Sequence, residues 1–325
     1  SAIMHTRRQY PVKPTDTILI TGAHGMLGTH LVSLLRTQGF LHLLQPTSRD
    51  LDLRCQSNVD SYFSSNVIDY VFHLAARVGG IKANMSAPSD FLVDNLQMQT
   101  VVFETARKYH VKKLLFVGSS CIYPRMCSQP MSEDQLLTGT LEPTNEGYAL
   151  AKITGLKACE YSNKQHGTNF ICLMPPNLYG PHDHFDLERS HVISALIHKF
   201  VAARTTNTPS VEVWGTGNAR REFLYAGDFA DAMFYFMQNY DAKDIPPFVN
   251  IGAGTDIRIK ELAELIKTET GYQGELRFDT TKPDGMPQKL LNVTLADKLG
   301  WHAKTSLRSG IQKTISWYQT TSLKT

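Results

Sequence analysis

The chain lacks any long hydrophobic run. No apolar stretch approaches the ~20 residues that a transmembrane helix requires, and residues 1–16 contain no apolar segment typical of a secretion signal. The sequence therefore predicts neither a membrane span nor a membrane partner, and it predicts no secretion signal.

Excess charge of one sign is also missing. Lys and Arg number 33 and Asp and Glu number 30, so the net charge is +3, and no basic run exceeds two residues. Nucleic-acid partners select strongly basic surfaces. We therefore expect no nucleic-acid partner.

Cysteine is scarce, and potential metal ligands are dispersed. The five cysteines are an odd number and form no Cys-x-x-Cys pair, so we interpret them as reduced thiols of a cytoplasmic protein. His182 and His184 are spaced like metal ligands, but no third ligand accompanies them at a useful spacing. The sequence therefore predicts no metal site.

Apolar segments alternate with helical patterns along the whole chain. The 325 residues are 42% hydrophobic and 19% charged, which suits one large or two closely packed globular domains. This alternation predicts an α/β fold with a doubly wound parallel sheet of the Rossmann type. The expected strands are Ile18–Thr21, Tyr70–Leu74, Lys113–Val117, Phe170–Leu173, Val211–Trp214 and Phe248–Ile251, and the expected helices are Leu27–Thr37, Asp90–Tyr109 and Gly147–Gln165.

A glycine-rich turn follows the first predicted strand. Gly22, Gly25 and Gly28 stand between Ile18–Thr21 and the apolar helix that contains Leu31–Leu35. Glycine lets the backbone approach a pyrophosphate, and a helix N-terminus offers free N–H groups and a positive dipole. A glycine triplet alone is often only a turn, but this strand–turn–helix context predicts dinucleotide binding.

The end of the second predicted strand bears on the choice of dinucleotide. Ser48 and Arg49 follow it, and a hydroxyl with a guanidinium suits a ribose 2′-phosphate. Asp50 weakens this signal, and Arg49 could also be merely solvated. The residues favour NADP(H) over NAD(H).

Tyr148 and Lys152 are four residues apart, so a helix places them on one face, one turn apart. Ser119 comes directly after the predicted strand Lys113–Val117 and can point at the phenol. Such a trio can pass a proton to or from an oxygen, and we expect the ammonium to lower the pKa of the tyrosine. The alternative is an ordinary pair on a helix surface.

Four motifs together resemble the extended short-chain dehydrogenases. These are Gly22–Gly28, His73–Ala76, Tyr148–Lys152 and Arg221–Tyr225. Further segments resemble the GDP-L-fucose synthases, a family of 3,5-epimerases and 4-reductases that act on GDP-4-keto-6-deoxy-D-mannose. These segments are Ala75–Ile81, Gly118–Pro124, Pro143–Glu146, Asn177–Asp183 and Lys282–Gly285.

The resemblance implies a division of the chain. It places a cofactor-binding Rossmann domain at residues 1–178, rejoined by about 220–255, and a smaller C-terminal domain for a GDP-sugar at 179–219 and 256–325. It also implies a homodimer formed through the helices near Phe91–Lys108 and Tyr148–Gln165.

The resemblance also implies the residues of the site. The expected cofactor contacts are Gly22, His24, Gly25, Met26, Leu27, Gly28, Ser48, Arg49, Asp52, Leu53, Leu74, Ala75, Ala76, Tyr148, Lys152, Pro175, Asn177, Leu178 and His191. The expected substrate contacts are Ser119, Ser120, Cys121, Asn177, Trp214, Arg221 and Lys289. For Trp214 the alternative is packing in the core.

A 3,5-epimerase needs a base and an acid on opposite faces of the sugar. Cys121 lies two residues after Ser119, close enough to the same pocket to act as the base, and the resemblance gives His191 as the acid. The alternatives are a small buried hydrophobe for Cys121 and a helix cap for His191. Ser119, Tyr148 and Lys152 would then serve the reduction at C4.

The sequence leaves the exact reaction open. Pro176 and His184 depart from the family pattern beside the expected substrate pocket. They allow a C4 reductase, with or without epimerase activity, that acts on a related GDP-4-keto sugar such as a heptose or a dideoxyhexose. A regulatory protein that binds a dinucleotide without turnover would predict damage to the catalytic trio, and that trio is intact.

Overall fold

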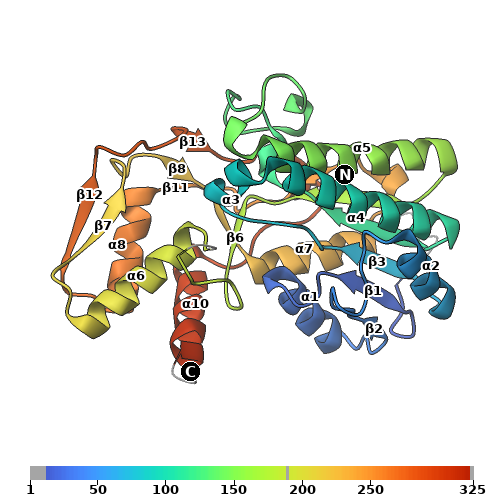
Figure 1. The fold of residues 1–325 in the computed structure, drawn as a ribbon, viewed down its shortest axis with the longest axis horizontal. Coiled ribbons are helices and arrows are strands. Elements are labelled where there is room, and N and C mark those ends of the chain that lie inside the picture. The colour runs from blue at the N-terminus through green and yellow to red at the C-terminus, as the bar shows by residue number, and fades with distance from the viewer. Residues whose placement is uncertain (1–11, 188–189, 323–325) are drawn as a thin grey trace.

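The computed structural model describes residues 12–187 and 190–322 of the chain. Residues 1–11, part of the segment in which no secretion signal is expected, lie outside this range. Six parallel strands form the main sheet, in the order β10-β5-β4-β3-β1-β2 (Figure 1). The predicted parallel α/β sheet is thereby confirmed. Its strands are β1 (Ile18–Thr21), β2 (Leu43–Leu44), β3 (Tyr70–His73), β4 (Lys113–Val117), β5 (Phe170–Met174) and β10 (Val249–Asn250).

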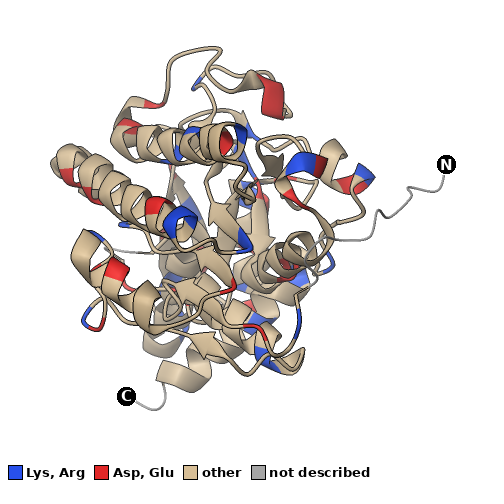
Figure 2. Cartoon of the chain, turned by 90° about the vertical axis from the view of Figure 1, so that its right-hand side faces the viewer, with Lys and Arg blue, Asp and Glu red and all other residues tan. Residues whose placement is uncertain are grey.

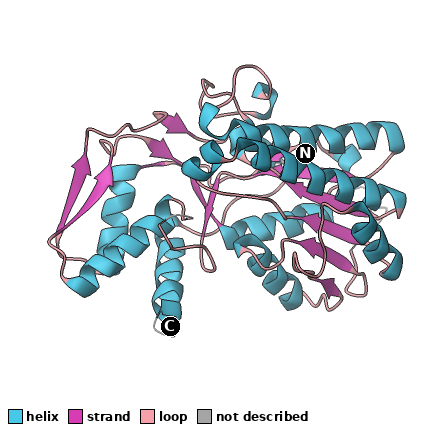
Figure 3. Ribbon diagram, viewed as in Figure 1, coloured by secondary structure: helices cyan, strands magenta, loops and turns pink. Residues whose placement is uncertain are grey.

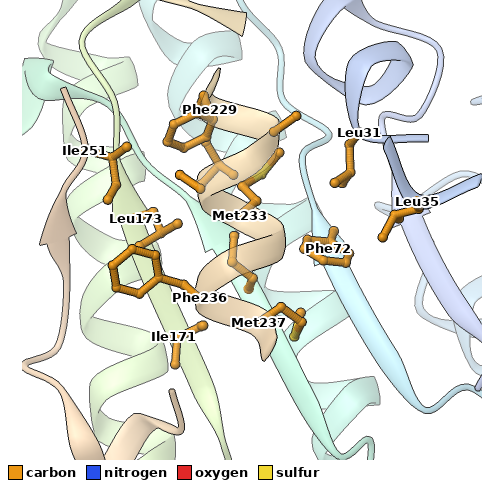
Figure 4. Packing of buried hydrophobic residues seen from close by; sticks show 14 of the residues in the cluster. Leu31, Leu35, Phe72, Ile171, Leu173, Phe229, Met233, Phe236, Met237 and Ile251 are labelled. Atoms are coloured by element: carbon orange, nitrogen blue, oxygen red, sulfur yellow. The ribbon is translucent and has the colours of Figure 1, made fainter. Parts of the chain in front are cut away.

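Both faces of this sheet are buried, because helices cover it on both sides. Alternate residues of each strand enter opposite cores, because side chains alternate across a strand. Phe72 and Leu173 belong to the core under α1 (Met26–Thr37) and α7 (Ala226–Asn239), where they meet Leu31 and Phe236 (Figure 4). Two hydrophobic cores therefore hold the sheet between helical layers.

The second core lies on the other face of the sheet. It joins Val71 and Phe116 of the strands to the apolar sides of three helices, which are α2 (Gln56–Ser65), α4 (Pro88–Lys108) and α5 (Glu146–His166). The helices α4 and α5 pack side by side along most of their length (Figure 1).

Three small sheets lie beside the main sheet, toward the left of Figure 3. In the first, β6 (Asn177–Tyr179) pairs with β9 (Phe223–Tyr225), and in the second, β7 (Ser210–Trp214) pairs with β12 (Glu275–Asp279). The third has the order β11-β8-β13, with bounds Ile257–Arg258, Arg220–Arg221 and Gln288–Lys289. A third hydrophobic core packs beside these sheets, on α6 (Val192–Thr206), α8 (Ile259–Thr270) and α10 (Leu307–Ser322).

One predicted strand belongs to a different sheet from the one expected. The apolar segment Val211–Trp214 is a strand, but it lies in β7 and pairs with β12 outside the six-stranded sheet. Burial explains the difference, because β7 alternates buried and exposed residues whereas β1, β3, β4 and β5 are buried throughout. The division into two domains at residues 178, 220 and 255 stays a prediction.

The remaining described elements are short. They are α3 (Ile81–Ser86), α9 (Thr294–Lys298) and the 3₁₀ turns η1 (Ser120–Ile122), η2 (Glu133–Gln135), η3 (Pro143–Asn145) and η4 (Ala242–Asp244). Basic and acidic positions are interspersed on the side of the molecule that Figure 2 presents. Over the described ranges, no helix is long and apolar enough to cross a membrane. The same residues contain no group of three or more His, Cys, Asp and Glu side chains arranged to hold a metal ion.

Candidate active site at the carboxyl ends of the parallel strands

The glycine turn after β1 leaves no room for side chains. Gly22 has φ +68°, and a Cβ there would lie 2.8 Å from the backbone nitrogen of Ala75. A Cβ on Gly28 would lie 2.3 Å from the carbonyl oxygen of Gly22. Gly25 has open space around it and instead forms the N-cap of α1. No side chain of Gly25 can therefore cover the free N–H groups of α1, which suit an anionic diphosphate.

The segment after β2 presents polar side chains to solvent. His24 Nε2 lies 3.0 Å from the carbonyl oxygen of Gln45, so the glycine turn meets the end of β2. Ser48 and Arg49 are exposed in the turn that follows. Asp50 accepts a hydrogen bond from the Thr47 backbone N–H at 3.0 Å, which helps to lower the pKa of this carboxyl. Asp50 thus caps its own turn, while Arg49 remains available to an anionic ligand.

Other predicted cofactor contacts lie around this turn. Asp52 pairs with Arg54 at 3.2 Å, and Leu53 packs on the second core. Leu74, Ala75 and Ala76 follow β3 and lie beside Gly22. Met26 and Leu27 are the first residues of α1, Pro175 directly follows β5, and Leu178 lies in β6.

Lys152 of α5 reaches the carboxyl end of β4. Its Nζ donates a hydrogen bond to the Val117 carbonyl at 2.9 Å and lies 5.5 Å from the centre of the Tyr148 ring. Burial lowers the pKa of Lys152 to about 8. The helix spacing predicted from the sequence therefore does bring the two side chains together.

The pKa of Tyr148 changes in the opposite direction to the one expected. Burial raises it, and the nearby Cys121 raises it further. The sequence shows the neighbouring ammonium but not the depth of the phenol, so the expected lowering is wrong for the unliganded protein. Tyr148 therefore keeps the neutral, proton-bearing form to a higher pH than a free tyrosine does.

Cys121 is buried in η1, directly after β4. Its backbone N–H donates to Ser119 Oγ at 3.4 Å. Burial raises the pKa of the Cys121 thiol, whereas Ser119, Lys289 and Lys152 lower it. Burial is the larger effect, so the net pKa of the thiol is raised, but the two lysines partly offset that burial.

Lys289 and Arg221 form a cationic pair beside this thiol. They are register partners on the parallel strands β13 and β8, and each is partly buried. Burial lowers the pKa of Lys289, and the charge of Arg221 lowers it further. Arg221 Nη1 donates to the Met286 carbonyl at 2.6 Å, which fixes the guanidinium. Neighbouring Arg220 instead pairs with Asp256 at 2.9 Å.

The remaining predicted residues lie at the edge of this group. Asn177 is exposed, and its Nδ2 lies 3.5 Å from the Glu222 carbonyl. Trp214 is 67% exposed, which excludes packing in the core. His191 is exposed at the N-cap of α6, in a different element from Cys121, and Ser120 lies beside Cys121 in η1.

Sequence reasoning gave no role to Glu222, which is 1% exposed. Its carboxylate accepts hydrogen bonds from the backbone N–H groups of Ala253 at 2.7 Å, Gly254 at 3.1 Å and Leu291 at 3.0 Å. These bonds connect the segment that contains Arg221 and Glu222 to the residues that follow β10 and β13. Burial raises the pKa of Glu222 to about 7, although the three hydrogen-bond donors lower it. The sequence did carry one signal for Glu222, because this carboxylate stands between Arg221 and the apolar residues that follow it.

The fold and the site together define a class of protein. A glycine turn with no room for a side chain at Gly22 or Gly28 opens onto a helix N-terminus, and a Tyr–Lys pair lies at the end of β4 in the same parallel sheet. This combination defines an extended short-chain dehydrogenase. The chain belongs to the NAD dependent epimerase/dehydratase family, whose model matches residues 18–252.

Relatives within this family cover nearly the whole chain. GDP-L-fucose synthase 1 of Arabidopsis thaliana is 48% identical over 301 residues, which are 93% of this chain and 92% of the relative. GDP-L-colitose synthase of Yersinia pseudotuberculosis is 42% identical over 302 residues, 93% of this chain and 97% of the relative. A solved structure of a GDP-mannoheptose C4 reductase from Campylobacter jejuni, with NADP bound, has a TM-score of 0.89. It is 37% identical and covers 95% of this chain and 99% of its own.

Proposed function

We propose that this protein is an NADPH-dependent 3,5-epimerase and 4-reductase that converts GDP-4-keto-6-deoxy-D-mannose to GDP-L-fucose. The observation that carries the proposal is the placement of Cys121 in the same buried cluster as Tyr148 and Lys152. A thiol base beside a proton-donating phenol serves two reactions at one carbonyl. The 48% identity to a GDP-L-fucose synthase supports the same conclusion.

The epimerisation would begin at the carbons next to the C4 ketone, whose protons the ketone acidifies. Cys121 removes a proton from C3 or C5 as a thiolate, which Lys289 and Lys152 stabilise. His191 is the proposed acid that returns a proton on the opposite face. His191 stands at the N-cap of α6, where its ring is exposed and can meet a ligand.

The reduction would follow at C4 of the same sugar. When bound, NADPH supplies the hydride for this carbon. Tyr148 is neutral and donates the proton to the C4 oxygen, with Ser119 as a second hydrogen-bond donor. Lys152 is held by the Val117 carbonyl over the Tyr148 ring, so its charge favours the phenolate that the transfer leaves.

The glycine turn and the end of β2 are the proposed cofactor site. Gly22, Gly28 and the start of α1 would hold the diphosphate, because these positions have no room for side chains. Ser48 and Arg49 would bind the 2′-phosphate, which makes NADPH the preferred cofactor. For the GDP part of the substrate, Arg221 and Lys289 would bind phosphate and Trp214 would offer its exposed ring.

A C4 reductase acting on another GDP-4-keto sugar is the second candidate. The likeness to the GDP-mannoheptose C4 reductase favours it, since that protein shares the fold over 95% of this chain. The two candidates differ in what Cys121 does, because a reductase needs no carbon base.

One experiment separates the two candidates. The purified protein is incubated with GDP-4-keto-6-deoxy-D-mannose and NADPH in deuterated water, and the product is examined by NMR. GDP-L-fucose with deuterium at C3 and C5 supports the first candidate. A C4-reduced product without deuterium at either carbon would favour the second. No NADPH consumption with this sugar would contradict the first candidate, and the second would then be tested with a GDP-4-keto-heptose.

We also infer that the protein is a homodimer formed by α4 and α5 with their copies, and that it works in the cytoplasm. Val93 of α4 and Leu150 and Tyr161 of α5 are exposed apolar side chains on these neighbouring helices. Leu150→Glu should then give a monomer in analytical ultracentrifugation. Val67→Glu, an equally drastic change at another exposed apolar residue, should leave the dimer intact.

A further inference from the structure

Two loops meet beside Trp214 through one carboxylate. Asp284 lies between β12 and β13, and it accepts hydrogen bonds from the Thr216 backbone N–H at 2.7 Å and the Thr216 hydroxyl at 2.6 Å. Thr216 belongs to the turn after β7. These two bonds help to hold the pKa of Asp284 below its ordinary value, so the carboxylate is ionised. The bonds are charge-assisted and join segments 68 residues apart.

The turn after β7 is shaped to receive this carboxylate. Gly215 has φ +92°, and a Cβ there would lie 2.3 Å from Asp284 Oδ1. The carboxylate therefore occupies the space of a side chain at Gly215. The Gly215 backbone N–H also donates to the Asp279 carbonyl at 2.9 Å, which continues the contact of β7 with β12.

The loop between β12 and β13 also contacts β8. Arg221 Nη1 donates to the Met286 carbonyl at 2.6 Å, and Nη2 lies 3.5 Å from the Asp284 carbonyl. The segment from Asp284 to Met286 thus lies between Thr216 and Arg221. Moving this segment would shift both the proposed phosphate contact and the turn that follows Trp214.

Trp214 is held at the edge of this arrangement. Its ring is 67% exposed, and Lys282 Nζ lies 5.0 Å from the ring centre. The exposed indole offers a flat apolar face to a ligand. A nucleotide base has a flat face that an indole can cover, and the cationic pair Arg221 and Lys289 suits its phosphates.

We propose that Asp284 is a positioning residue that fastens the loops on which Trp214, Lys282 and Arg221 lie, and that it thereby sets the affinity for the GDP part of the substrate. This inference rests on the proposed function. Each oxygen of Asp284 accepts a hydrogen bond from Thr216, so the proposed role of the carboxylate is to hold the two loops together. It acts far from the reacting carbons, through the order of the two loops.

The expected effect is on binding and not on chemistry. Without the carboxylate, the two loops become ordered only when GDP binds. The conformational entropy lost in that ordering weakens the binding. Asp284→Ala should raise the Kd for GDP and the KM for the GDP-4-keto sugar about tenfold. The kcat should stay within about twofold, since Cys121 and Tyr148 keep their surroundings.

The test measures GDP binding by calorimetry and steady-state kinetics on the full chain. The matched control is Asp279→Ala, because Asp279 accepts hydrogen bonds from Thr281 within its own loop. The control should leave Kd and KM unchanged. Thr216→Val removes the hydroxyl from the other loop, and it should weaken GDP binding in the same direction by a smaller factor.

Four results would overturn the inference. If Asp284→Ala bound GDP with wild-type affinity, the hydrogen bonds between Asp284 and Thr216 would not set the binding affinity. Equal losses of GDP affinity in Asp284→Ala and Asp279→Ala would show a general effect of disturbing the loop. A fall in kcat with unchanged Kd and KM would show that Asp284 acts in the reaction and not in binding. If the wild-type protein itself failed to bind GDP, the proposed function would fall together with this inference.

Discussion

Thr21 Oγ1 lies 2.9 Å from His73 Nδ1, and this contact joins the carboxyl ends of β1 and β3. Thr21 Oγ1 also accepts the backbone N–H groups of Leu74 at 3.0 Å and Ala75 at 3.1 Å. Among the described residues, the other ring nitrogen of His73, Nε2, is buried and has no hydrogen-bond partner. Burial lowers the pKa of His73 to about 3, which keeps the ring neutral beside Lys152.

This contact sets the spacing between the glycine turn and the residues after β3. Thr21→Val should leave the Ala75 backbone N–H and His73 Nδ1 without their hydrogen-bond partner, whereas the Leu74 N–H keeps its bond to the Thr21 carbonyl at 3.2 Å. The loss should cost about 1–3 kcal/mol of unfolding free energy. It should also weaken NADPH binding, because Ala75 lies against Gly22. Urea denaturation and NADPH fluorescence titration measure the two effects. Thr37→Val, at an exposed threonine at the end of helix α1, should change neither.

Cys121→Ser should separate the two proposed reactions. A serine hydroxyl is too weak a base for a carbon acid, whereas Tyr148 and Lys152 keep their contacts. Deuterium from solvent should then stop entering C3 and C5, while NADPH is still consumed. NMR of the product and absorbance of NADPH check both. Cys127→Ser is the control, and exchange at full rate in Cys121→Ser would make Cys121 a packing residue.

Tyr148→Phe should have the opposite effect. The change removes the proton donor for the C4 oxygen and leaves Cys121 in place, so NADPH oxidation should fall by roughly 10²–10⁴. Some deuterium exchange at C3 or C5 should survive. Single-turnover measurement of NADPH oxidation tests this, and a near-normal rate would assign the proton to another donor.

Arg49 should distinguish the two nicotinamide cofactors. Because Asp50 is engaged by its own turn, Arg49 is the exposed cation that faces a 2′-phosphate in the proposed site. Arg49→Ala should weaken NADPH binding roughly 10- to 100-fold and leave NADH binding nearly unchanged. Isothermal titration with each cofactor measures this, with Arg36→Ala at an exposed position of α1 as the control. Equal losses for both cofactors would contradict a 2′-phosphate contact.

Glu222 should make stability depend on pH. Its pKa is about 7 in the folded protein against 4.5 as the ordinary value, so folding favours the protonated carboxyl. That contribution is fully present below about pH 4.5 and is lost as the pH rises through 7. Between pH 5 and pH 8 the unfolding free energy should therefore fall by about 2–3 kcal/mol more in the wild type than in Glu222→Gln.

Denaturation curves at the two pH values check this slope. Glu264→Gln, at an exposed position of α8, should keep the wild-type difference. The same slope in Glu222→Gln as in the wild type would show that Glu222 is ionised in the folded state throughout this range.

Features set by neighbouring residues could be predicted from the sequence. The glycine turn, and the pairing of Tyr148 with Lys152, depend only on local spacing, and the structure places them as expected. The main sheet follows from the alternation of apolar strands and helices. The strand bounds differ by about one residue, since apolar patterns extend beyond the hydrogen-bonded ladder.

Features that join distant segments could not be predicted. Glu222 bonds to residues near 253 and 291, and no local pattern pairs these positions. The partner of β7 was missed for the same reason, because apolar alternation predicts a strand but not its neighbour. The pKa of Tyr148 depends on how deeply the fold encloses the phenol, which spacing alone does not give.

The position of β10 at one edge of the main sheet bears on how the nascent chain folds. The other five strands have all left the ribosome once Met174 has emerged, but β5 gains its outer neighbour only when Val249–Asn250 follows. Until then β5 presents an open edge that can pair with the wrong strand. Synthesis that stalls between these positions would release a fragment prone to aggregation, which makes this interval the natural point for a chaperone to act.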